Sequence, residues 1–253
     1  MPEKPISEKP IEIKMQNGEG ISDSIFFHPE GEGPWPGVLY FTDIGGIRAA
    51  NRESAAQLAQ QGYAVLMPNI FYRTGRAPLL PSIRTLDDEG RKKRMTELST
   101  PLTPEAIERD ASTYIDILTA QKSTRPGMIG VVGHCFSGKM AMFAAAARPD
   151  KVAAAASFHG GGLLTNNSAS PHLVLPRIKA RLYFAHAVED RSMPAEAIAQ
   201  FEQALKRWGG QYQSETYEGA YHSWTSTDSP VYNQPQAERA FRKLLELLQQ
   251  TLH

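Results

Sequence analysis

The only cysteine of this sequence, Cys135, lies in the segment best suited to covalent chemistry. The apolar run Met128 to Val132 before it predicts a buried strand, and the Ala- and Met-rich run Ser137 to Ala147 after it predicts a helix packed on a sheet. Gly133 lies where the G-x-S-x-G nucleophile elbow has its first glycine, Ser137 lies where it has the second, and Gly138 follows directly. Gly133 and Gly138 flank the cysteine without a Cβ, so that strand and helix can approach closely. The dipole of the following helix favours a thiolate. The pattern therefore predicts a cysteine nucleophile in place of serine.

The alternative for Cys135 is a purely structural role. A free cysteine is commonly a small apolar core residue, and strings that resemble an elbow also occur by chance. Considered alone, the residue leaves both interpretations open. The decision depends on whether the chain also supplies a base and a carboxylate in the right order.

Composition limits the class of protein. The chain has 253 residues, of which 41% are hydrophobic and 21% charged, as expected for a globular protein with one large α/β core. Lys and Arg together number 27, as do Asp and Glu, so the formal net charge is zero. Without a basic block, neither a nucleic acid nor a membrane surface is an expected partner.

The expected compartment is the cytoplasm. A single cysteine cannot form an intrachain disulfide, which is consistent with a reducing environment. The first ten residues contain Pro, Glu and Lys where a secretory signal would have an apolar core, and no segment approaches transmembrane length. Residues 1–10 are expected to form a flexible arm, followed by a single domain over residues 11–253.

Predicted strands alternate with predicted helices along most of the domain. An opening antiparallel pair is followed by further strands, at Ile11–Met15, Ile21–Phe27, Gly37–Phe41, Tyr63–Pro68, Val152–Phe158, Arg181–Ala185 and Gln211–Tyr217. Helices are expected at Arg52–Gln61, Pro104–Gln121, Pro194–Trp208 and from Pro235 to the end. The charged run at residues 87–94 mixes both signs and indicates a solvated helix face. This alternation predicts a single doubly wound, mostly parallel sheet with helices on both faces.

Polar residues follow the predicted strands at the edge where ligands bind in such sheets. Asp190 lies in the loop after the strand that starts at Arg181, and His222 lies in the loop after the next strand. In enzymes with a nucleophile elbow, the catalytic residues follow one another along the chain in the order nucleophile, carboxylate, histidine. The carboxylate orients the imidazole, and the imidazole accepts the nucleophile's proton. The ordered set predicts a catalytic triad of Cys135, Asp190 and His222.

Other histidines are weaker candidates for the base. His134 adjoins Cys135, but neighbouring strand residues point to opposite faces, so it should face away from the sulfur. His159 and His186 follow strands and could line the pocket. The remaining three have no such placement: His28, His172 and His253.

Five segments resemble the signature regions of the dienelactone hydrolase (carboxymethylenebutenolidase) family, which has the α/β-hydrolase fold. They are Gly133–Gly138, Asp190 with Met193-Pro194, Tyr217–Trp224, Phe41–Gly46 and Pro68–Arg73. The resemblance implies a Cys-His-Asp hydrolase that opens lactones or esters through a thioester, with a small-molecule substrate and neither metal nor organic cofactor. It also implies an oxyanion hole from the backbone N–H groups of Phe136 and Ile44. We expect a monomer or a small homo-oligomer.

The sequence departs from the family pattern at the positions that would bind substrate. Where the family has a glutamate beside the thiol, this chain has the shorter Asp43. Arg73 matches the first of two arginines that hold the substrate carboxylate, and the second falls on Ser226.

These departures leave three functions open. The first is a Cys-dependent hydrolase of small lactones or esters, with Asp43 and Arg73 in the substrate site. The second is a broader carboxylesterase or thioesterase for uncharged acyl substrates, which Asp43 and Ser226 favour. The third is a binding or sensor protein with little catalysis, in which Cys135 responds to oxidation.

Overall fold

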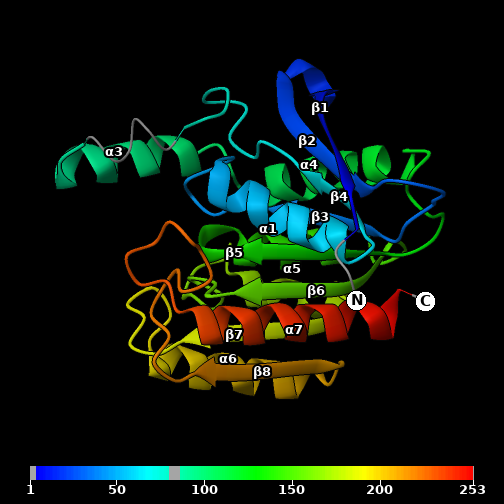
Figure 1. Cartoon of the computed structure of the whole chain (residues 1–253). Helices are drawn as coiled ribbons and strands as arrows, with labels where there is room; N and C mark the ends of the chain where they lie inside the picture. Colours follow the sequence, from blue (N-terminus) through cyan, green and yellow to red (C-terminus); the bar gives the residue numbers. More distant parts are fainter. Residues whose placement is uncertain (1–3, 80–85, 253) are drawn as a thin grey trace. The chain divides into compact units, whose positions relative to one another are not determined.

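The computed structural model describes residues 4–79 and 86–252, which form two compact units divided between Gly127 and Met128 (Figure 1). The proposed triad residues all lie in the second unit. Each unit is an α/β arrangement with its own strands and covering helices.

The first unit opens with an antiparallel strand pair, β1 (Ile6–Lys14) and β2 (Ile21–Pro29), joined by the short 3-10 turn η1 (Gln16–Gly18). The sheet continues from β2 to the antiparallel β4 (Ala64–Met67), and β4 pairs in parallel with β3 (Gly37–Phe41). Every residue of β3 and β4 is buried, as their continuous apolar sequences predict for central strands.

Helices α1 (Ala49–Gln60) and α4 (Pro104–Thr119) pack on the strands of the first unit. The Thr103 hydroxyl caps α4 by accepting a hydrogen bond from the Ala106 N–H, and Pro104 occupies the first turn. The expected apolar face of this helix is confirmed, because Ile107, Tyr114, Ile115 and Leu118 are all buried.

Helix α3 (Asp88–Ser99) contains the mixed charged run and behaves as that composition predicts. Leu98 is its one buried residue among those described, and Figure 1 shows the helix apart from the strands of its unit. Asp87 caps it by accepting from the Gly90 N–H.

The second unit contains four parallel strands in the order β5 (Ile129–His134), β6 (Val152–Phe158), β7 (Arg181–Ala187) and β8 (Tyr212–Tyr217). Its α-helices are α5 (Gly138–Ala147), α6 (Ala195–Trp208) and α7 (Gln234–Thr251), with two 3-10 helices, η2 (Cys135–Ser137) and η3 (Pro171–Arg177). Helix α5 packs on β5 and β6, and α7 packs on β6 and β7. Because the strands are parallel, their carboxyl ends share one edge, and the loops there carry the candidate catalytic residues.

The structure moves several predicted boundaries. Ile6 to Pro10, expected in the flexible arm, are already paired with β2, so β1 starts five residues before Ile11. Helix α1 starts at Ala49 instead of Arg52. Strand β7 runs two residues further than expected, so His186 lies inside the strand and not in the loop after it. In the part of the chain that is described, no helix is both long and apolar enough to cross a membrane.

Candidate active site

The turn at Cys135 needs both of its flanking glycines. Cys135 follows β5 directly with a backbone φ of +56°, in the left-handed region that side chains other than glycine rarely adopt. A Cβ on Gly133 would lie 2.1 Å from the carbonyl oxygen of Ser137. A Cβ on Gly138 would lie 2.3 Å from Ser157 Oγ and 2.7 Å from the Gly160 Cα. The strand, the turn and α5 can therefore pack this closely only with glycine at both positions.

Ser137 closes the same turn with its side chain. Its hydroxyl accepts a hydrogen bond from the His134 N–H at 2.9 Å and donates to the His134 carbonyl at 3.1 Å. The residue is buried. Serine thus takes the place that glycine has in the elbow pattern and adds two hydrogen bonds to it.

Three side chains from three loops form one hydrogen-bonded chain. His222 Nε2 lies 2.9 Å from Cys135 Sγ, and His222 Nδ1 lies 2.6 Å from Asp190 Oδ2. The Asp190 side chain is 3% exposed and the His222 side chain 31%. The carboxylate is therefore held in the interior while the imidazole remains accessible from outside, as a base that meets substrate requires.

Ser192 fixes the second oxygen of the carboxylate. Its backbone N–H and its hydroxyl both donate to Asp190 Oδ1, at 2.8 and 2.6 Å. The hydroxyl also lies 3.3 Å from His222 Nδ1. Sequence reasoning missed this residue, although Asp-x-Ser after a strand is a recognisable signal for a side chain that turns back to bond its own loop.

The hydrogen bonds among these side chains shift the pKa values of His222 and Asp190. Burial by itself would lower the pKa of His222, but the hydrogen bonds to Asp190 and Cys135 raise it to about 10. Burial would raise the pKa of Asp190, yet hydrogen bonds from His222 and Ser192 hold it below its ordinary value. The site thus stabilises a carboxylate beside a protonated imidazole.

The structure separates the competing histidines. His134 stacks on Phe158 with ring centroids 5.3 Å apart. His186 is 2% exposed, with Nε2 lying 3.0 Å from Ser214 Oγ. His159 is buried with its ring against that of His222, at 5.3 Å between centroids. Among these histidines, it is His222 that lies within hydrogen-bonding distance of the sulfur.

The sequence model of the dienelactone hydrolase family matches residues 23–252, which is most of the chain. The chain belongs to the dienelactone hydrolase family. It is 28% identical over 229 residues to a candidate carboxymethylenebutenolidase of Synechocystis, covering 88% of this chain and 89% of the relative. It is also 28% identical over 219 residues to the carboxymethylenebutenolidase of Rhodococcus opacus, covering 85% and 80%.

The fold agrees with this family. The crystal structure of a candidate dienelactone hydrolase from Klebsiella pneumoniae superposes with a TM-score of 0.86 at 20% identity, over 98% of this chain and all of the other. The predicted fold class, an α/β-hydrolase fold with a mostly parallel sheet, is therefore confirmed, as is the assignment of the chain to the hydrolases.

The two residues expected in the family's substrate site are engaged within the first unit. Asp43 forms a bidentate ion pair with Arg48 at 2.7 and 2.8 Å, and it accepts the Gly45 N–H at 2.8 Å. Arg73 binds the Asp110 carboxylate at 2.6 and 2.9 Å and also pairs with Glu19. The Asp43 carboxylate and the Arg73 guanidinium are therefore both paired with other charged side chains of the first unit.

The remaining predicted positions are distributed over both units. Ile44 lies in the first unit, in the turn that the Gly46 N–H closes on the Asp43 carbonyl. Phe136 lies in the second, directly after Cys135, with its ring under the Lys139 ammonium at 4.3 Å. The Ser226 hydroxyl donates to Asp228 at 2.9 Å. The oxyanion hole of dienelactone hydrolases at Ile44 and Phe136 stays a prediction.

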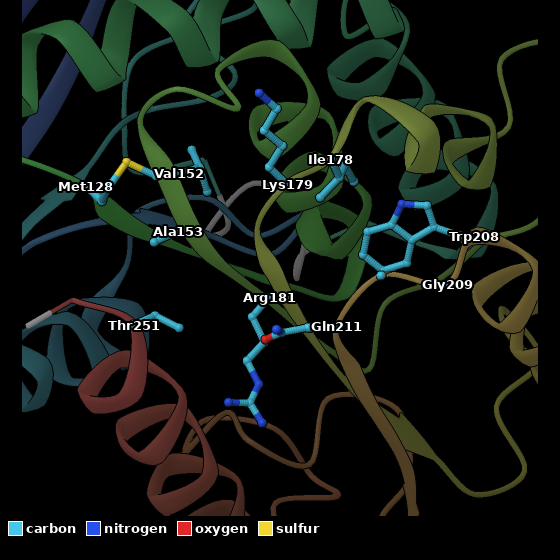
Figure 2. A pocket seen from close by; sticks show the side chains of 11 residues that line it. Met128, Val152, Ala153, Ile178, Lys179, Arg181, Trp208, Gly209, Gln211 and Thr251 are labelled. Carbon is cyan, nitrogen blue, oxygen red and sulfur yellow. The ribbon is translucent and has the colours of Figure 1, made fainter.

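A hollow of about 600 Å³ lies at the opposite edge of the second unit's sheet, where Val152 begins β6 and Arg181 begins β7. In Figure 2 the side chains of Lys179 and Arg181 extend in opposite directions, so the two cations do not converge on one position. Within residues 4–79 and 86–252, no cluster of three His, Cys, Asp or Glu side chains could hold a metal ion.

Proposed function

We propose that this chain hydrolyses small lactones or esters through a thioester formed on Cys135. The observation that carries the proposal is the chain of hydrogen bonds from Cys135 Sγ through His222 to Asp190. In this scheme the sulfur is the nucleophile, the imidazole is the base and the carboxylate orients the imidazole. The carboxymethylenebutenolidase name of the Rhodococcus relative supports a lactone or ester as substrate.

Acylation begins when His222 Nε2 takes the thiol proton and Sγ attacks the substrate carbonyl carbon. The carbonyl electron pair moves to oxygen, and the tetrahedral intermediate collapses by breaking the C–O bond of the ester. His222 returns its proton to the departing alkoxide, which for a lactone stays attached to the acyl group. The product of this half-reaction is a neutral alcohol and a thioester.

Deacylation repeats the same steps with water. His222 removes a proton from a water molecule, whose oxygen attacks the thioester carbonyl, and the sulfur leaves as thiolate. Asp190 stabilises the imidazolium in both halves without taking its proton. The Phe136 N–H, next to the nucleophile, is the proposed donor to the intermediate's oxyanion, and Ile44 the second.

A panel of lactones and chromogenic aryl esters, assayed with purified protein and with Cys135→Ala, tests the proposal. We expect turnover by the wild type and essentially none by the variant, together with a trapped acyl group on Cys135 by mass spectrometry. Turnover that survives in Cys135→Ala would refute the thioester route. Absence of any ester turnover would instead favour the binding or redox-sensing function.

A second candidate function is the hydrolysis of uncharged acyl substrates, as by a carboxylesterase or thioesterase. The specific observation in its favour is that Arg73, expected to hold a substrate carboxylate, binds Asp110 and Glu19 instead. Ser226 removes the other expected cation. A higher kcat/KM for neutral esters than for matched esters with a carboxylate would support this candidate.

A further inference from the structure

His159 occupies an unusual position at the end of β6. It is 1% exposed and has a backbone φ of +41°, in the left-handed region that residues with a Cβ rarely adopt. Its N–H nevertheless extends the ladder by donating to the Ala185 carbonyl at 2.8 Å. Such backbone conformations cluster at functional sites, so the side chain of His159 is a candidate for a function in the proposed catalytic site.

The ring of His159 contacts the loop that carries the proposed base. Its Nε2 lies 2.8 Å from the hydroxyl of Thr225, three residues after His222. The ring also packs edge to face against His222 and Trp224, at 5.3 and 5.0 Å between centroids. One side chain thus holds this loop through one hydrogen bond and two ring contacts.

The loop that begins at His159, directly after β6, contacts the turn at Cys135. The N–H of Gly161 donates to the Cys135 carbonyl at 3.4 Å, and Gly160 is the residue that a Cβ on Gly138 would meet at 2.7 Å. His159 therefore lies directly between a loop fitted tightly to the elbow and the loop that carries His222.

His159 is uncharged in this setting. Burial lowers its pKa well below 6.5, and the neighbouring His222 and His134 lower it further. A neutral imidazole can lie against His222 without repelling the proton that His222 carries. The side chain therefore suits a supporting role and not that of a second base.

We propose that His159 is a positioning residue which, through Thr225, holds His222 at hydrogen-bonding distance from Cys135. This inference rests on the proposed function. It predicts that the hydrogen bond between His159 and Thr225 affects the rate of the chemical steps more than substrate binding, because neither side chain is proposed to touch substrate.

The experiment compares His159→Phe, Thr225→Val and the double variant in ester hydrolysis. His159→Phe keeps an aromatic ring and removes the hydrogen bond, and Thr225→Val removes only the hydroxyl. We expect each to lower kcat about tenfold with KM within about twofold. The kcat of the double variant should be within about twofold of that of the less active single variant, since the two residues act as one unit. Thr225→Ser keeps the hydroxyl and should keep the wild-type kcat.

Two controls separate positioning from general damage to the fold. His186→Phe and Ser214→Val remove a comparable buried histidine–hydroxyl contact, 3.0 Å long, from the neighbouring strands β7 and β8. We expect these to leave kcat within about twofold of wild type. Independent effects of His159→Phe and Thr225→Val on kcat, or losses matched by the controls, would overturn the proposal.

A measurement without turnover keeps this test separate from that of the proposed function. The proton between His222 Nδ1 and Asp190 should give a low-field NMR resonance in the wild type. We expect Thr225→Val to weaken or shift it while Ser214→Val leaves it unchanged. An unchanged resonance in Thr225→Val and His159→Phe would refute the positioning role even if the enzyme turned out to use another nucleophile.

Discussion

At the scale of the residue, the protonation of His222 is central to the reaction proposed for Cys135. The hydrogen bonds to Asp190 and Cys135 raise the pKa of His222 to about 10, so the imidazole holds a proton beside the sulfur at neutral pH. In the proposed mechanism this proton comes from the thiol and later passes to the departing alkoxide. The hydrogen bonds of His222 to Asp190 and Cys135 therefore suit the proton transfers of the proposed reaction.

Replacing Cys135 with Ala should remove essentially all ester turnover, because the acyl group can then no longer bond to sulfur. Iodoacetamide should inactivate the wild type with one label per chain, as a single cysteine allows. The stoichiometry can be read by mass spectrometry. Labelling of the single cysteine without loss of activity would contradict a role for its sulfur.

His222→Ala should lower kcat by orders of magnitude, because it removes the proposed base. His134→Ala serves as the comparison, since that ring stacks on Phe158. If His134→Ala were inactive and His222→Ala active, the base would have been misassigned.

Ser192→Ala should lower kcat about tenfold, because the Asp190 carboxylate loses a hydrogen bond of 2.6 Å to its Oδ1. Ser192→Thr keeps the hydroxyl and is expected to retain most of the activity. Measuring kcat of both variants and the wild type on one aryl ester tests the role of the Ser192 hydroxyl. Equal kcat in Ser192→Ala and the wild type would exclude such a role.

The sequence predicted the proximity of Cys135, Asp190 and His222, because each follows a strand in a parallel array whose ends meet. It did not predict Ser192 or the placement of His159. Ser192 acts through a local turn of two residues, and His159 acts through Thr225, 66 positions later. Contacts of the second kind depend on side-chain packing that periodicity does not encode.

At the scale of the element, the tight turn between β5 and α5 depends on glycines, because a Cβ would not fit there. Gly133→Ala should destabilise the protein by about 3 kcal/mol or more and abolish activity, since the new Cβ would overlap the carbonyl oxygen of Ser137 at 2.1 Å. Gly90→Ala is the matched control. There the nearest atom, at 3.0 Å, belongs to the flexible Asp87 side chain at the start of an exposed helix.

Chemical denaturation measures both effects. We expect Gly90→Ala to remain within about 1 kcal/mol of wild type, because alanine favours the helix while the Asp87 cap shifts slightly. A Gly133→Ala protein with wild-type stability would mean that β5 and α5 can move apart, against the close packing described for this turn.

Arg73 joins three elements of the first unit. It reaches α4 through Asp110 and the turn before β2 through Glu19, and its side chain is 14% exposed. Arg73→Ala should cost about 3 kcal/mol of unfolding free energy, because the Asp110 carboxylate, 4% exposed, would be left buried without its guanidinium partner. Arg76→Ala, which removes an exposed pair with Glu12, should cost less than about 1 kcal/mol.

Kinetics of Arg73→Ala distinguish this structural role from the substrate-binding role predicted from sequence. A structural role predicts similar kcat/KM losses for charged and neutral esters in the folded fraction. A loss of about tenfold confined to carboxylate-bearing lactones would restore the substrate role. Sequence position could not separate the two, because Glu19 and Asp110 lie 54 and 37 residues away from Arg73.

At the scale of the whole molecule, two histidines give stability an opposite dependence on pH. Burial lowers the pKa of His186 from 6.5 to about 4. The unfolded chain therefore binds this proton first as pH falls, and the contribution of His186, full above about pH 6.5, is lost towards pH 4. The loss should reach about 3 kcal/mol, and unfolding free energies of wild type and His186→Phe across this range should diverge accordingly.

His222 acts at the alkaline end. Its pKa is raised in the folded state, so its contribution to stability is full below about pH 6.5 and is lost as pH rises through about 10. We expect His222→Gln to lose less stability than wild type over that interval, as measured by urea unfolding in a pH series. A parallel decline in both proteins would mean that the folded state does not favour the protonated imidazole.

Most of the fold could be predicted from the hydrophobic pattern of the sequence and from residues that start or end helices and strands. Continuous apolar runs located β3, β4, β5 and β6, and Thr103 before Pro104 located α4, because burial and capping are properties of local sequence. The start of β1 was missed since residues 6–10 contain Ser, Glu, Lys and Pro, and their strand conformation depends on pairing with β2. Exposed edge strands depend on such pairing more than on composition.

Trp224 gives the loop of the proposed base a native optical label. It is fully buried, stacked on Tyr217 at 5.1 Å and packed against His159, two residues after His222. The other two tryptophans, Trp35 and Trp208, are partly exposed. With both of those changed to Phe, the emission wavelength of the remaining indole would follow the solvation of this loop directly. Acylation, release of product and displacement of the base could then be timed by stopped-flow fluorescence without any added dye.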